Sequence, residues 1–252
     1  MKNFHEYLTH KISMNKRITV LVIALLSFSI SQAQWKKIKG NGNITTETRS
    51  TSDYDAIKCA GSFDYILVAG TEGKITLEGE SNLLQYVVTE VKNGSLHIKT
   101  KKGKNLSPSW NKTIKITIPF EDINKVALSG SGDLWNEDKI IANNLEVSLS
   151  GSGDIILNLQ TKHVSGKVTG SGDLTLKGST TDLKAGVTGS GDFHGFNLQS
   201  TNTDVSVTGS GDAAVVCSGH LKARVTGSGD IEYRGNPKTE DTKVSGSGSI
   251  EN

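Results

Sequence analysis

Six aspartates recur at a nearly constant spacing in the second half of the chain, each directly after a Gly-Ser-Gly. They are Asp133, Asp154, Asp173, Asp192, Asp212 and Asp230. Hard cations such as calcium bind carboxylate oxygens, so these six are the candidate calcium ligands. The match to the calcium repeat G-G-x-G-x-D is poor, because here the Asp follows the last Gly directly and the period is about 19 residues. The preferred interpretation is that each aspartate caps a turn.

Catalysis by the same aspartates is not expected. Acid–base catalysis needs two carboxyl groups in different environments, whereas a repeat gives its copies a common environment. The histidines after residue 33, which are His97, His163, His194 and His220, share no position in the repeat and have no metal-ligand spacing. No nucleophile elbow, P-loop or H-E-x-x-H motif occurs. The sequence therefore predicts a protein that is not an enzyme, with no catalytic residues and no cofactor.

The elements that position the aspartates are predicted by the repeat itself. Successive aspartates are 21, 19, 19, 20 and 18 residues apart, and Ser249 takes the seventh place 19 residues later. Apolar residues keep the same phase in every copy; five residues before the Asp stand Leu149, Val168, Val187, Val207, Val225 and Val244. Apolar residues alternate with polar ones, which indicates strands with one buried face. Equal phase favours parallel stacking over an antiparallel meander, so we expect an all-β parallel β-helix or solenoid with coils of about 19 residues.

Both glycines of the Gly-Ser-Gly motif occupy alternate positions at which a side chain would point toward the core. Glycine at such a position leaves the core empty, so it indicates a bend or a close approach of two backbones. Glycine also permits a positive φ angle at a corner. We therefore expect this motif at a bend between two strand segments, and the need for a bend in every coil explains the repeated glycines.

Residues 52–128 are less regular and are expected to form an N-terminal β region that caps the solenoid, while residues 129–252 form the repeated part. Asn93-Gly94 between alternating runs predicts a hairpin. Gly61-Ser62-Phe63-Asp64 is a degenerate copy of the repeated motif. Further strands are predicted at residues 63–68, 74–79 and 113–120, with a single helical turn near Ser81.

Residues 1–33 are predicted to be a secretory signal peptide, with Met14 as an alternative start. Lys16 and Arg17 precede an apolar run from Ile18 to Ile30, and Ser31-Gln32-Ala33 is a suitable cleavage site before Gln34. The apolar run is too short for a membrane span of about 18 residues. Residues 34–51 are rich in Gly, Asn and Thr and are predicted to be a flexible arm.

The charge of the mature part is nearly balanced. Cleavage removes Lys2, Lys11, Lys16 and Arg17 from the 28 basic residues and Glu6 from the 26 acidic ones, which leaves 24 and 25. This balance excludes a basic field for nucleic acid or for anionic lipid. Cys59 and Cys217 are expected to be two small half-buried apolar residues, with a disulfide between them as the alternative that an exported compartment permits. The aromatic residues near the start of the repeat, which are Tyr86, Trp110, Phe120 and Trp135, are expected to cover an end of the solenoid.

The chain resembles a bacterial family, the putative auto-transporter adhesin, head GIN domain. The residues that carry the resemblance are the "SQAQ" cleavage site, "YDAIKCAGSFDYILVAG" from Tyr54, and "ITIPFEDINKVALSGSGDL" leading into repeated V-x-G-S-G-D. The resemblance implies a right-handed β-helix, export in bacteria and an adhesin label, but no catalytic residues.

The expected function is that of a non-enzymatic exported envelope protein, an adhesin or a binding scaffold, in the periplasm or at the surface of a Gram-negative bacterium. A carbohydrate-active enzyme and a calcium-stabilised adhesive module on a β-helix are the alternatives. The expected partner is a cell-surface glycan or an envelope protein, with homo-oligomers through the solenoid ends as a further option. No nucleic-acid partner and no membrane span in the mature form are expected.

Overall fold

The structure is a computed structural model that describes residues 36–252. The predicted signal peptide, Met14 and the cleavage site before Gln34 lie outside the described residues. Apart from one helical turn, the described chain is built of strands. The prediction of an all-β solenoid with coils of about 19 residues is confirmed.

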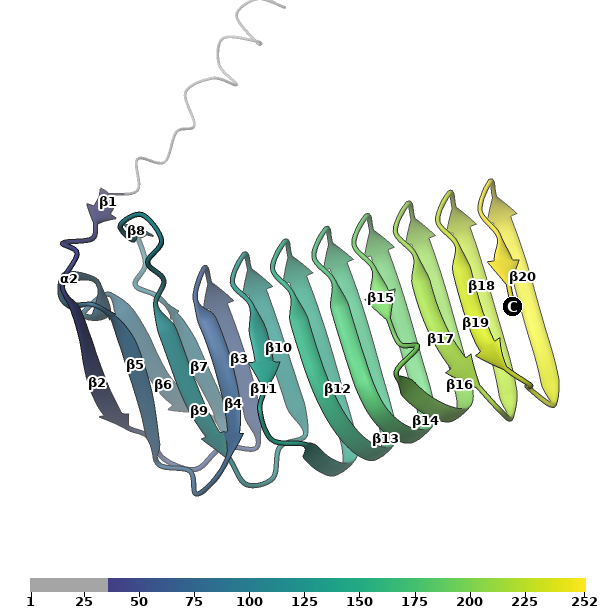
Figure 1. Cartoon of the computed structure of the whole chain (residues 1–252), viewed down its shortest axis with the longest axis horizontal. Helices are drawn as coiled ribbons and strands as arrows, with labels where there is room; N and C mark the ends of the chain where they lie inside the picture. Colours follow the sequence, from purple (N-terminus) through teal and green to yellow (C-terminus); the bar gives the residue numbers. More distant parts are fainter. Residues whose placement is uncertain (1–35) are drawn as a thin grey trace, which may run out of the picture. The chain divides into compact units, whose positions relative to one another are not determined.

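Each coil consists of two strand segments that meet at the Gly-Ser-Gly-Asp corner. In β14 (Leu174–Gly189), the chain leaves one corner, bends near Thr180 and runs to the next corner. It pairs in parallel with β13 (Ile155–Gly170), from Ile155 opposite Leu174 to Gly170 opposite Gly189. Figure 1 shows the successive coils stacked side by side, with the corners along the upper edge and the second bend along the lower edge.

The remaining strands of the stack continue this pattern in parallel. They are β10 (Lys125–Gly130), β11 (Leu134–Asn136), β12 (Ile140–Gly151), β15 (Phe193–His194), β16 (Leu198–Gly209), β17 (Ala213–Cys217), β18 (His220–Gly227), β19 (Ile231–Gly235), β20 (Thr239–Gly246) and β21 (Ile250–Glu251). The strands before and after the corners form two facing rows, and their inward side chains make one continuous core. The antiparallel meander is therefore excluded for the repeated region.

The first coil of the stack lies far earlier in the sequence than the other coils. β3 (Ala56–Gly61) pairs in parallel with β10, with Gly61 opposite Gly130. β4 (Asp64–Ala69) pairs in parallel with β11, with Tyr65 opposite Leu134. The degenerate motif Gly61-Ser62-Phe63-Asp64 is thus a true corner, as the sequence predicted.

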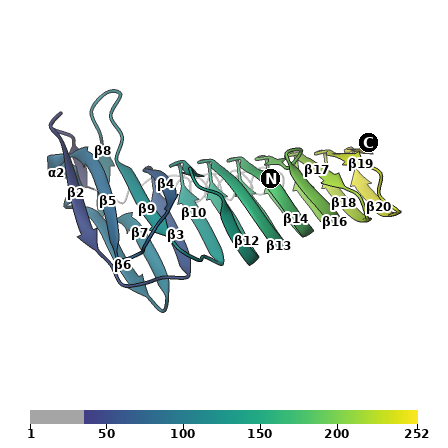
Figure 2. The ribbon, with the colours of Figure 1, turned by 60° about the horizontal axis from the view of Figure 1, so that its bottom comes forward.

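The cap is built by the strands before the first coil and by those between the first coil and the second. β7 (Ser95–Thr100) pairs in parallel with β3, and β9 (Lys115–Phe120) pairs in parallel with β4, so both rows continue on the side of the first coil that faces away from the repeated coils. β6 (Val87–Lys92), β5 (Lys74–Glu80) and β2 (Ile44–Ser50) then add antiparallel strands. Figure 2 shows this mixed region at the left, before the regular stack. A separate two-stranded sheet joins β1 (Lys36–Lys39) to β8 (Lys104–Ser107).

Local predictions for the cap are confirmed. β6 and β7 form the hairpin, and its turn places Asn93 at φ 50° and Gly94 at φ 67°, as an Asn-Gly turn requires. The helical turn is α2 (Ser81–Leu84). The predicted flexible arm over residues 34–51 is wrong for residues 44–50, because β2 pairs with all seven residues of β5. Arg49 also donates to the Leu84 and Val87 carbonyl oxygens.

The cap and the core contain two arrangements that hold specific residues together. Glu80 is buried, and its carboxylate accepts hydrogen bonds from the Gly42 backbone and from the Ser109 backbone and hydroxyl group, which joins three loops. In the core, Gly166 makes room for Phe193, whose ring would lie 2.9 Å from a Cβ atom at that position. The coils are therefore not identical in the core, because a small residue in one coil makes room for a large side chain of another.

Candidate functional site

The six aspartates form a ladder along the corner edge, and each one binds the backbone of the next coil. The Asp133 Oδ1 atom accepts a hydrogen bond from the Asp154 amide, and this contact repeats at every later step with N–O distances of 2.6 to 3.1 Å. The sequence predicted that the aspartate caps a turn; the structure adds that the capped amide belongs to the following coil. One oxygen of each carboxylate is used in this way.

The two ends of the ladder explain where the motif changes. Ser249 stands in place of the last aspartate, and no later coil follows it within the described residues. At the other end, Phe63 replaces the second glycine, because the corner of the first coil has no Gly-Ser-Gly corner beneath it. In the later coils a Cβ atom at this position would lie about 2 Å from the carbonyl oxygen of the preceding coil, as at Gly172.

One part of the ladder also has metal-ligand geometry. Ligand atoms of Asp173, Asp192 and His194 lie within 4.8 Å of one another, and the His194 Nε2 atom is 3.9 Å from the Asp173 Oδ2 atom. Two of the six calcium candidates of the sequence, Asp173 and Asp192, thus lie in this cluster, and His194 is its third member. This cluster adjoins an open cleft of about 500 Å³ that contains Phe196, whose ring carries the Arg234 guanidinium 3.7 Å from its centre.

A larger groove follows the stack close to the second bend, away from the aspartate ladder. It encloses about 780 Å³ and runs across β12, β13, β14, β16 and β18. At adjacent strand spacings of about 4.8 Å, five strands give a length of roughly 20 Å. We call this feature the axial groove. Its two sides are outward-facing residues two positions apart on each strand, with a buried residue between them.

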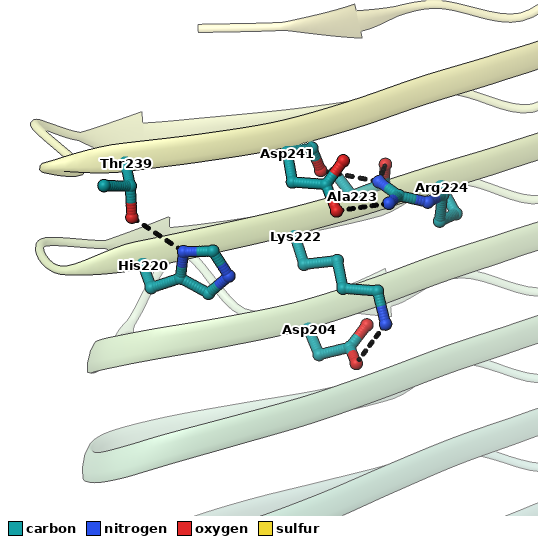
Figure 3. Close-up of polar contacts among 7 residues, drawn as sticks. All are labelled: Asp204, His220, Lys222, Ala223, Arg224, Thr239 and Asp241. Carbon is teal, nitrogen blue, oxygen red and sulfur yellow. Dashed lines mark hydrogen bonds and ion pairs between the residues drawn. The ribbon is translucent and has the colours of Figure 1, made fainter.

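One side of the axial groove carries a row of linked polar residues that runs from His163 to His220 and continues to Thr239 beyond the groove, and we call this row the polar column. Asp182 is its centre: one carboxylate oxygen lies 2.7 Å from His163 Nδ1, and the other accepts from the Asn202 amide at 2.8 Å. The Asn202 oxygen accepts from the His220 backbone amide, and His220 Nδ1 lies 2.7 Å from the Thr239 hydroxyl group. These contacts fix the orientation of the side chains in the row, and Figure 3 shows its last step.

The opposite side of the axial groove alternates in charge. Glu146, Lys184, Asp204 and Lys222 contribute charged groups, and Lys222 pairs with Asp204 at 3.1 Å. Figure 3 also shows the next pair on this face, where Arg224 binds Asp241. With Asp182 included, the groove holds three carboxylates and two ammonium groups, so it lacks a strong field of either sign.

Two carboxyl groups with raised pKa lie elsewhere. Burial, and then the neighbouring Asp133 carboxylate, raise the pKa of Asp64, which stands at the start of the ladder. Burial also raises the pKa of Glu72, which accepts a hydrogen bond from the Tyr54 backbone amide at 2.6 Å. Neither residue lines the axial groove or the cleft beside His194.

Other residues singled out from the sequence take varied positions. Cys59 and Cys217 are both buried free thiols, and burial raises the pKa of the Cys59 thiol well above its ordinary value. Phe120 is buried in the cap, as expected for a covering residue. Trp110 is 89% exposed and covers nothing, so the prediction for it is wrong. Its loop, after β8, has too few neighbours to bury a side chain of that size.

The sequence reasoning missed the polar column and the hydroxyl groups of the second bend. Thr161, Thr180 and Ser200 are buried there, and the Thr161 hydroxyl donates to the Thr180 hydroxyl at 3.0 Å. A polar residue recurring at an inward position was the available signal. For the groove, the signal was weaker: His163, Asp182, Asn202 and His220 are in register, but the aligned residues differ in type.

One family model and several solved structures match the chain. Residues 53–237 match the family model described as putative auto-transporter adhesin, head GIN domain. Among solved structures, a putative adhesin from Bacteroides fragilis has a TM-score of 0.79 at 23% identity, and covers 85% of this chain and 99% of its own. A putative lipid binding protein from Parabacteroides distasonis has a TM-score of 0.70 at 28% identity, with coverage of 86% and 99%.

A putative adhesin from Parabacteroides distasonis also matches, with a TM-score of 0.69, 25% identity and coverage of 86% and 99%. No curated protein matches the chain. Within residues 36–252, no helix is long and apolar enough to cross a membrane. The repeated corner, the first coil contributed by β3 and β4 and the family match together show that the chain belongs to the putative auto-transporter adhesin, head GIN domain family.

Proposed function

We propose that this protein is a non-enzymatic binding module of the bacterial cell envelope, and that the axial groove is its ligand surface. The observation that carries the proposal is the polar column, in which a close His163–Asp182 contact and three hydrogen bonds link residues of five successive coils, four of which line the groove. Such a pre-oriented row lowers the conformational cost of binding an extended ligand. The adhesin descriptions of the family and of its structural relatives support a binding role.

A binding role also accounts for the acidic groups better than catalysis does. The ladder aspartates share one task, since each holds the next coil, whereas acid–base catalysis needs two carboxyl groups in different environments. Asp64, whose pKa is raised, has a buried carboxyl group outside the axial groove. A carbohydrate-active enzyme remains the alternative, and it predicts product release from a polysaccharide.

Export is the second part of the proposal. The adhesin family description fits an exported protein, and the N-terminal sequence supports cleavage before Gln34. Expression of the full chain in a Gram-negative host, followed by fractionation and mass spectrometry, tests this. A mature N-terminus at Gln34 in the periplasmic fraction or on the surface is expected, and an uncleaved cytoplasmic product would refute it.

Binding is tested with purified mature protein and isolated bacterial envelopes. Ser165 faces the centre of the axial groove, and Ser165→Trp fills it. Ser150, an exposed residue on the same face of β12, lies outside the groove and provides the matched control Ser150→Trp. Saturable binding should be lost in the first variant and kept in the second, with no release of sugar products. Equal binding by both variants, or product formation, would contradict the proposal.

A further inference from the structure

We propose that the axial groove binds a linear, electrically neutral, β-linked glycan, with about one sugar residue over each coil. This inference rests on the proposed function, because it names the ligand of the same surface. It starts from the spacing of the groove. Neighbouring strands are about 4.8 Å apart, which is close to the length of one sugar residue in an extended β-linked chain. A periodic protein surface and a periodic polymer can then remain in register over all five strands of the groove.

The charges of the groove favour a neutral polymer. A polyanion such as a nucleic acid needs an excess of Lys and Arg, which supply most of its binding free energy. Here Lys184 and Lys222 are outnumbered by Glu146, Asp182 and Asp204. A polycation would meet the two ammonium groups. An uncharged ligand is repelled by neither the carboxylates nor the ammonium groups, and it can form hydrogen bonds with both.

The backbone of the groove favours a glycan over an extended peptide. A peptide strand binds by pairing with an open sheet edge. The strands under the centre of the groove are paired on both sides: β13 lies between β12 and β14, and β14 lies between β13 and β16. Recognition must therefore come from side chains, and sugar hydroxyl groups suit them because each hydroxyl both donates and accepts.

Groups that can serve a ligand are present beside the paired ones. Among the described residues, Asn144, Ser165 and Lys184 have no side-chain hydrogen-bond partner, and they supply an amide, a hydroxyl and an ammonium group to the groove. The Nε2 atom of His220 is available next to its bond to Thr239. The polar column thus offers a ligand side chains held in place by their neighbours, and these further groups offer it donors and acceptors that are not yet used.

Length dependence gives the sharpest test. The mature protein is titrated calorimetrically with neutral β-linked gluco-, manno-, xylo- and N-acetylglucosamine oligosaccharides of increasing length. For at least one series, affinity should rise about threefold or more per added sugar, as one net hydrogen bond each would give. The rise should stop at about five sugars, where the groove ends. Oligoglucuronates of the same lengths and with β-1,4 linkages serve as the charged comparison and should bind more weakly.

The outcomes separate this inference from the proposed function. Ser165→Trp should abolish oligosaccharide binding, while Ser150→Trp should leave it within about twofold of the unmodified protein. If no neutral series binds, if affinity is independent of length, or if the β-linked glucuronates bind best, the glycan inference is overturned. Groove-dependent binding to envelopes would then still support the proposed function. If envelope binding is insensitive to Ser165→Trp, the proposed function itself fails.

Discussion

Replacement of a single corner glycine in the middle of the stack should weaken the whole solenoid. In Gly172→Ala, the new Cβ atom would lie 2.0 Å from the Gly153 carbonyl oxygen, and both contacting groups belong to paired backbones that cannot rotate away. The coils must move apart at this corner. That movement lengthens the bonds from the Ser171 and Gly172 amides to the Gly151 oxygen, now 2.9 and 3.1 Å.

The expected cost follows from these contacts. Forcing an extra carbon into a packed site costs about 1–3 kcal/mol. Two weakened hydrogen bonds add about 0.5–1.5 kcal/mol each. We therefore expect the free energy of unfolding to fall by about 2–6 kcal/mol, with a lower urea midpoint as the readout.

The chain offers a matched control and a graded variant for this prediction. Gly186 lies in the next coil with ordinary space around it, since its Cβ atom would lie 3.7 Å from the Ser206 hydroxyl group. Gly186→Ala should be neutral or stabilising by up to about 1 kcal/mol. Gly248→Ala makes a 1.9 Å clash in the last described coil, and it should cost less than Gly172→Ala because within the described residues this coil has a neighbour on one side only. Equal midpoints for Gly172→Ala and Gly186→Ala would refute the reasoning.

Four further predictions concern the ladder, the cap and the open end. Asp192→Ala leaves the Asp212 amide without its acceptor and should cost about 1–3 kcal/mol by urea denaturation, whereas Asp192→Asn, which keeps an acceptor oxygen, should cost less. Burial alone would raise the pKa of the Glu80 carboxyl group, but the hydrogen bonds from Ser109 and Gly42 outweigh burial, so the net pKa lies below the ordinary value of 4.5. The stability that ionised Glu80 gives to the fold is therefore present above pH 4.5 and is lost as the pH falls further. Glu80→Gln should therefore destabilise by about 1–3 kcal/mol at pH 7, with a difference that shrinks in acid; an unchanged difference would contradict this. Glu240 is an exposed acid in β20, at a position that is apolar in most of the other coils. Its charge should oppose strand pairing between two molecules of this protein, so Glu240→Leu should form larger species in light scattering. Because one oxygen of each ladder aspartate already holds an amide, a chelator should leave the melting temperature unchanged, and a fall of several degrees would favour the calcium alternative.

The repeated part of the fold was predictable because each coil has the same pattern of inward apolar residues and corner glycines. The valine column, the glycines and the constant phase at Val168 and Val187 together indicate parallel stacking before any coordinate is known. The cap was predictable only locally. The Asn93-Gly94 turn was identified, but the pairing of β2 with β5 was not, because a polar strand carries no alternation to reveal it.

The candidate site was less predictable than the fold. The aspartate ladder stands out because its residue type is constant, yet its task is structural. The polar column does not stand out, because His163, Asp182 and Asn202 differ in type and only their register unites them. Interactions between unlike side chains on neighbouring coils depend on three-dimensional alignment, which a search for a repeated letter does not detect.

The way in which the coils are joined has a mechanical consequence. Backbone hydrogen bonds, buried side chains and a single passage of the chain connect each coil to the next, and within the described residues β20 has a parallel neighbour only in β18. A pull along the stack would therefore open the coils one after another from that end. Each opened coil of about 19 residues would release roughly 60 Å of chain. A module that yields in such steps lengthens under load while the remaining coils stay folded.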